Sequence, residues 1–83
     1  MKYTSVRVGQ LIRETRTSMG LTQERLALAA GTGLRFIIDL EKGKPTCELE
    51  KALIVLNTLG IDIALNPPEA TAKRLLHAEP EAG

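Results

Sequence analysis

Residues 20–44 of this 83-residue chain read GLTQERLALAAGTGLRFIIDLEKGK, and this stretch decides the fold. Thr22 is suited to cap the start of a helix, because its hydroxyl can accept hydrogen bonds from the free N–H groups of a first turn. Gly31 is suited to end that helix, because glycine adopts the left-handed backbone of a C-terminal cap without a Cβ clash. A second helix is predicted over residues 33–42, with Gly43 as its terminator. The stretch therefore predicts two short helices joined by a glycine-containing turn.

The sequence on either side of this stretch predicts two more helices. One is expected over residues 8–19, where apolar or small residues recur at steps of three and four and Gly20 follows as terminator. The other is expected from Thr46, as its cap, to Leu59, with Gly60 as terminator. The apolar stripe of this last helix is wider than one small core needs. We therefore expect part of it to face a second subunit.

The composition limits the class of protein. Hydrophobic residues make up 43% and charged residues 25%, a balance typical of a globular domain, while the 2% of aromatic residues favours an aliphatic helical bundle over a β-sandwich. No apolar stretch approaches the roughly 20 residues that cross a bilayer. The single cysteine, Cys47, excludes a disulfide framework. We expect a cytoplasmic protein with no membrane association.

Charge is divided unevenly along the chain. The net charge is +1, but residues 1–45 carry eight Lys or Arg and four Asp or Glu, whereas residues 46–83 carry three and six. A basic first half is what a nucleic-acid-binding face would produce. Chance asymmetry on a solvated surface explains the same counts equally well. Charge alone therefore leaves the partner open.

The segment after the fourth predicted helix, Ile61–Leu65, alternates apolar and polar residues and predicts a short strand. A lone strand leaves its backbone groups unpaired. It would pair either with the N-terminal stretch Tyr3–Val6 or with its own copy across a two-fold axis. We favour the copy, because an isologous pair needs no further sequence. The chain is then a domain of residues 1–66 followed by a mobile tail, 67–83, in which a short helix could order against a partner.

The predicted pair of helices resembles a known family. Its marks are GLTQERLA at residues 20–27, AGT at 30–32, and LEKGK at 40–44. Together they resemble the phage-repressor (Xre-type) helix-turn-helix family over residues 8–59. The resemblance implies an all-α, lambda-repressor-like bundle of four to five helices, to which the short C-terminal strand adds a pairing across a dimer. It also implies that the helix of residues 33–42 enters the major groove of double-stranded DNA, so that the protein would be associated with the nucleoid when bound.

The outward side chains of that helix are the candidates for reading bases. Arg35 is the first choice, because a guanidinium can contact O6 and N7 of guanine together. Asp39 could accept from a cytosine amino group or pair with Arg35 and hold it in place, and we favour the pairing. The predicted base-reading residues are Leu34, Arg35, Ile38 and Asp39. The residues for which family positions and helix ends imply phosphate contacts are Thr22, Gln23, Gly33, Lys42 and Lys44.

Two further features follow from the family positions. Arg16 and Glu41 fall where an inward-facing ion pair joins the first helix to the third, a structural role rather than a DNA contact. Gly33 stands where the family usually has a Ser or Thr cap, and Thr32 could serve instead.

Residues 33–37 (GLRFI), 39–46 (DLEKGKPT) and 59–63 (LGIDI) also resemble HipB-like antitoxins. The resemblance implies that the protein is a homodimer, represses its own operon and binds a HipA-like serine/threonine kinase toxin. The residues predicted to form the dimer interface are Val55, Leu59, Ile61, Ile63 and Leu65.

An enzyme is not expected. The only histidine, His77, lies in the predicted tail, and no carboxylate pair, metal-ligand spacing or phosphate-binding glycine loop is present in the sequence. We expect no catalytic residue, no cofactor and no metal. One alternative is a protein-interaction module that keeps the fold and binds DNA weakly. Another is a stand-alone Xre-type regulator without a toxin.

Overall fold

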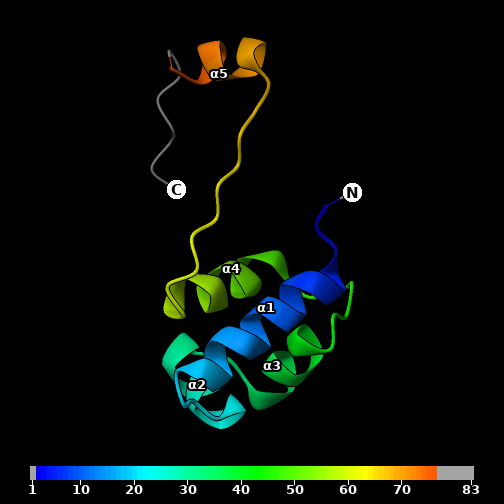
Figure 1. Ribbon diagram of the computed structural model, residues 1–83, viewed down its shortest axis with the longest axis vertical. Coiled ribbons are helices and arrows are strands. Elements are labelled where there is room, and N and C mark those ends of the chain that lie inside the picture. The colour runs from blue at the N-terminus through cyan, green and yellow to red at the C-terminus, as the bar shows by residue number, and fades with distance from the viewer. Residues whose placement is uncertain (1, 77–83) are drawn as a thin grey trace.

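A computed structural model describes residues 2–76, and these form five helices. The helices are α1 (Ser5–Ser18), α2 (Gln23–Ala30), α3 (Leu34–Glu41), α4 (Leu49–Thr58) and α5 (Glu69–Leu76). Helices α1 to α4 pack into one body, and α5 stands apart at the end of an extended segment, residues 61–68 (Figure 1). None of the helices described is long and apolar enough to cross a membrane. The expected all-α helix-turn-helix fold is confirmed.

The core is aliphatic and draws on all four helices of the body. Ile12 of α1, Leu26 of α2, Ile37 of α3 and Val55 of α4 are fully buried. Burying a side chain of this size contributes about 1.5–3 kcal/mol relative to leaving it in water. Helices as short as α2 and α3 are marginal alone, so this shared burial holds them together. Phe36 packs against the same core, with Lys51 Nζ of α4 6.0 Å from its ring centroid.

The signals that join α2 to α3 act as the sequence predicts. Thr22 Oγ1 accepts a hydrogen bond of 3.1 Å from the backbone N–H of Arg25, which caps α2. Gly31 ends α2 in the left-handed region, with φ of 68°. Gly9 is needed for a different reason, because a Cβ there would meet the carbonyl oxygens of Leu40 and Glu41 at the end of α3. This close approach fixes α1 against α3.

Two helices begin elsewhere than expected. Helix α1 begins three residues earlier, because Thr4 caps it by accepting from the backbone N–H of Arg7 at 3.1 Å. Thr46 does not cap α4: the N-cap position is Glu48, and Thr46 lies in a turn. The predicted cap by Thr32 is wrong too. Gly33 holds the N-cap of α3, and Thr32 Oγ1 is buried without a hydrogen bond among the described residues.

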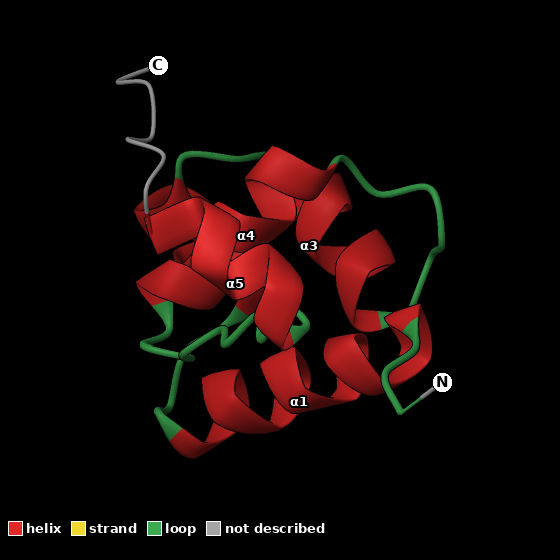
Figure 2. Ribbon diagram, turned by 90° about the horizontal axis from the view of Figure 1, so that it is seen from above, coloured by secondary structure: helices red, strands yellow, loops and turns green. Residues whose placement is uncertain are grey.

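The predicted strand is not formed within one chain. Residues 61–68 are extended but pair with no other segment of residues 2–76. Figure 2 shows only helices and loops in the described part of the chain. Pairing with the N-terminal stretch is wrong, because Ser5 and Val6 belong to α1. Pairing with a second copy stays a prediction. Part of the predicted tail forms α5, whereas residues 77–83, with His77, lie outside the described part of the chain.

Candidate nucleic-acid interface

Helix α3 buries one side and presents the other. Ile37 and Leu40 are buried in the core. Leu34 and Arg35 are exposed, and Ile38 is half-buried. This division follows from the 3.6-residue period of the helix, which puts residues 37 and 40 on one side. The orientation of the predicted base-reading side chains is therefore as expected, and their contacts with bases remain a prediction.

Asp39 holds two cations on the exposed side of α3. One carboxylate oxygen lies 3.3 Å from Arg35 Nε, and the other lies 3.6 Å from Lys44 Nζ. The side chain of Asp39 is only 19% exposed, whereas that of Arg35 is 77% exposed. A partly buried carboxylate beneath an exposed guanidinium limits where the guanidinium can point. This geometry matches the favoured role of Asp39 as the partner of Arg35.

Arg16 and Glu41 form the predicted ion pair between α1 and α3. Arg16 Nε lies 2.6 Å from Glu41 Oε2, and Arg16 Nη2 lies 2.9 Å from Oε1. Arg16 also donates from Nη1 to the carbonyl oxygen of Leu21, at 2.8 Å. Hydrogen bonding to Glu41 raises the pKa of Arg16 above its ordinary value, against the opposing effect of burial. The pair is structural, as expected, since both groups are largely buried.

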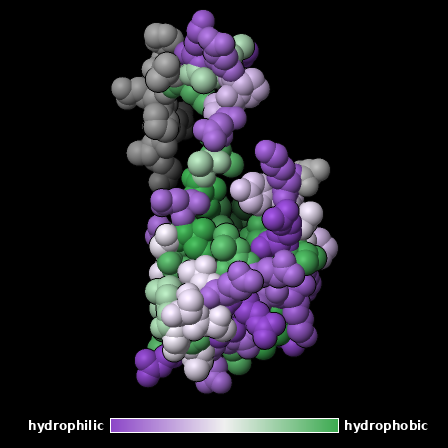
Figure 3. Space-filling view, in the orientation of Figure 1, coloured by the Kyte–Doolittle hydropathy of each residue, from purple (hydrophilic) through white to green (hydrophobic). Residues whose placement is uncertain are grey.

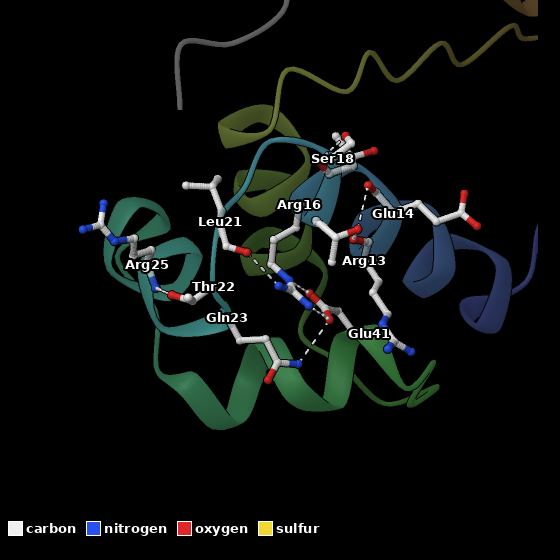
Figure 4. A network of polar contacts seen from close by, with 11 residues as sticks. Arg13, Glu14, Arg16, Ser18, Leu21, Thr22, Gln23, Arg25 and Glu41 are labelled. Atoms are coloured by element: carbon white, nitrogen blue, oxygen red, sulfur yellow. Dashed lines mark hydrogen bonds and ion pairs between the residues drawn. The ribbon is translucent and has the colours of Figure 1, made fainter.

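Gln23 joins this ion pair. Its Nε2 donates to Glu41 Oε1 at 3.1 Å, and the side chain is half-buried (Figure 4). From the sequence, this side chain was expected to contact a phosphate. In the folded chain one N–H of its amide is donated to Glu41, which leaves the second N–H and the helix N-terminus as donors for an anion. Sequence alone gives no signal for this contact, because residues 23 and 41 lie on different helices.

A hollow of about 270 Å³ opens beside this cluster, between α1 and the end of α3. Its lining residues are Arg13, Arg16, Gln23, Ile38, Glu41 and Lys42. Arg13 is not among the residues predicted from the sequence to form the interface. In Figure 4 it points along the same side as Glu41. Its position three residues before Arg16 could have indicated that it lies beside the ion pair, since residues at that spacing are neighbours on a helix surface.

Two predicted interface residues belong to the core of the chain itself. Val55 is fully buried, and Leu59 is 6% exposed, so neither has surface left for a second subunit. Their assignment to a dimer interface is wrong, because α4 turns them into the core of the chain rather than outward. The exposed apolar residues at this point of α4 are Leu53 and Ile54.

An apolar groove of about 920 Å³ runs between the N-terminal segment, α1 and residues 61–66. Ile63 and Leu65 line it and are exposed, while Ile61 is half-buried against the core. Tyr3 and Leu11 line the same groove and are exposed too. The space-filling view shows apolar surface where the extended segment leaves the body (Figure 3). Three of the predicted interface residues therefore lie together on one face.

The fold and this surface together define a class of protein. Two helices joined at Gly31, the second with an exposed face that carries Arg35, are the arrangement of a helix-turn-helix DNA-binding domain. The sequence profile of a helix-turn-helix family matches residues 12–66. The chain belongs to this Xre-type family of DNA-binding transcriptional regulators.

One similar protein is y4mF of Sinorhizobium fredii, described as an uncharacterised HTH-type transcriptional regulator. The two sequences are 49% identical over 65 residues, which is 78% of this chain and 86% of y4mF. The match therefore extends over most of both proteins.

Proposed function

We propose that this protein is a homodimeric, sequence-specific repressor that acts in the cytoplasm on a palindromic operator. The single observation that carries the proposal is the exposed guanidinium of Arg35 held over the half-buried Asp39. A guanidinium oriented before binding loses less conformational entropy when it contacts guanine. Leu34 and Ile38 lie on the same exposed side and suit the methyl groups of thymine.

The homodimer is supported by the apolar groove and its exposed residues. Ile63 and Leu65 lie on an extended segment whose backbone has no sheet partner in the described chain. An antiparallel pairing of two copies would satisfy those backbone groups and cover the apolar side chains together. In such a dimer the two α3 helices would lie about 34 Å apart, one turn of DNA.

The proposal includes a role as antitoxin of a HipA-like serine/threonine kinase. It rests on the resemblance of residues 33–37, 39–46 and 59–63 to HipB-like antitoxins. The test is co-purification of the tagged chain with the product of the adjacent gene, followed by a kinase assay with and without the chain. A stable complex with reduced kinase activity is expected. A neighbouring product that is no kinase, or does not bind, would leave a regulator without a toxin.

The DNA-binding function is tested with the DNA upstream of the gene. We expect the logarithm of the binding constant to fall steeply with the logarithm of the salt concentration, because each neutralised phosphate releases counterions. Arg35→Ala is expected to relax the preference at one base pair per half-site. Lys44→Ala is expected to weaken binding to all sequences alike.

The second candidate, an interaction module that binds DNA weakly, is favoured by one observation. Leu34, at the start of α3, is apolar and 39% exposed. Flat salt dependence with sequence-independent binding at micromolar or weaker affinity would support the module and contradict the repressor.

A further inference from the structure

Two cationic side chains line the hollow beside α3, and no joint function has yet been given to them. Arg13 lines it from α1, and Lys42 lines it from the end of α3. Among the described residues neither makes an ion pair, whereas Arg35 and Lys44 both pair with Asp39. The hollow therefore carries positive charge that no ion pair within residues 2–76 neutralises.

The acidic residue in the hollow does not neutralise these cations. Both carboxylate oxygens of Glu41 accept hydrogen bonds from Arg16, and Oε1 accepts a further one from Gln23. The side chain of Glu41 is 4% exposed. An ion pair of this kind carries no net charge, so the charge that an approaching ligand meets is that of Arg13 and Lys42.

The hollow lies along one edge of the exposed face of α3, and Lys44 lies along the other. Glu41 borders the hollow, while Asp39 holds Lys44. Residues two positions apart project about 160° apart around a helix. A helix in the major groove has one phosphate backbone on each side, because the groove is about 12 Å wide and a helix with side chains about 10–12 Å. Cations at both edges fit that arrangement.

We propose that Arg13 and Lys42 together hold one backbone phosphate of the DNA, on the opposite edge of α3 from Lys44. The proposal rests on the DNA-binding function and adds to it a phosphate site with residues from two helices. Arg13 supplies a planar fork of N–H donors and Lys42 a point charge, which together suit a phosphodiester. This site also places Lys42 and Lys44, both predicted to contact phosphates, on opposite edges of α3.

The test measures binding of the full chain to a short duplex of arbitrary sequence, since phosphate contacts do not depend on sequence. Fluorescence anisotropy is recorded between about 50 and 200 mM salt. The double variant Arg13→Ala/Lys42→Ala is expected to lower the slope of log K against log salt by about 0.9, one phosphate. Each single variant is expected to lower it by less, because the other cation remains. Arg13→Lys is expected to keep the slope of the unaltered protein.

Arg25→Ala is the matched control. It removes one positive charge, as each single variant does, from an exposed helical position, and in Figure 4 the guanidinium of Arg25 points away from Glu41. Its slope is expected to stay that of the unaltered protein. A double variant with the slope of this control overturns the proposal. A slope reduced by about 1.8 does so too, because that result means two separate phosphates. Unaltered protein with no salt dependence contradicts DNA binding itself, which is a different failure.

A second arm separates a DNA phosphate from free phosphate. Thermal unfolding is followed with millimolar inorganic phosphate and with sodium chloride of equal ionic strength. The proposal expects no difference between the two salts. Phosphate-specific stabilisation of the unaltered protein that the double variant lacks would overturn it in favour of a free-phosphate site.

Discussion

The ion pair between Arg16 and Glu41 gives the most quantitative prediction, through the variant Glu41→Ala. The substitution removes the acceptor of three hydrogen bonds, two from Arg16 and one from Gln23. It leaves Arg16, whose side chain is 11% exposed, with only its bond to the carbonyl oxygen of Leu21. The cost is then that of a largely buried charge without its partner.

Removing one partner of a buried ion pair costs about 3–5 kcal/mol. We take the lower end, about 3 kcal/mol, because the hollow beside the pair admits water to Arg16. In a domain of this size each kcal/mol lowers the melting temperature by about 4–8 °C, so a loss of about 12–24 °C is expected. Such a loss is a large part of the stability of a small domain.

The assays are urea unfolding for the free energy and thermal unfolding for the melting temperature, both followed by circular dichroism, with Glu48→Ala as the control. Glu48 pairs with Lys51 at 3.3 Å, but both side chains are more than half exposed. The control is therefore expected to lose less than about 1 kcal/mol. The double variant Arg16→Met/Glu41→Leu is expected to recover most of the stability, because no buried charge remains. Equal small losses in Glu41→Ala and Glu48→Ala would refute the structural role of the pair.

Three other predictions concern separate parts of the chain. Asp39→Ala is expected to reduce discrimination between operator and random DNA, because Arg35 loses its anchor, and to raise affinity for random DNA, because a negative charge is removed. Fluorescence anisotropy with both duplexes measures this, and unchanged discrimination would contradict the role of Asp39 as an anchor. Gly9→Ala is expected to lower the free energy of unfolding by about 1–3 kcal/mol, because its Cβ would clash with the backbone of α3. The control Gln10→Ala should change this free energy by less than about 0.5 kcal/mol, and urea unfolding measures both; equal small changes would contradict the clash. Ile63→Asp is expected to give monomers by light scattering, while Ile63→Val keeps the dimer; a dimer in both would exclude the proposed sheet.

The helix-turn-helix could be predicted because its signals are local. The cap by Thr22 and the stop at Gly31 depend on residues within one turn of themselves. The wrong cap predictions came from residues whose side chains suit a helix cap but which do not stand at the first position before a helix. Thr46 has the right side chain for a cap, but the chain turns there and α4 begins after Glu48.

The apolar surface of α4 could not be assigned from its pattern. Apolar residues occur on more than one side of this helix. The periodicity of the sequence therefore does not say which side faces the core. The packed structure buries Val55 and Leu59 and exposes Ile54. Burial is a property of the other helices as much as of this one.

The order of the helices, the aliphatic core and the outward side of α3 could all be read from the amino-acid sequence, because each depends on spacing along the chain. Only the tertiary structure decided that Gln23 joins Arg16 and Glu41, that Asp39 holds Lys44, and that Arg13 shares a hollow with Lys42. Apart from Asp39 and Lys44, these residues come from different helices. Their distances depend on how the helices cross, and the core packing of many side chains sets that angle.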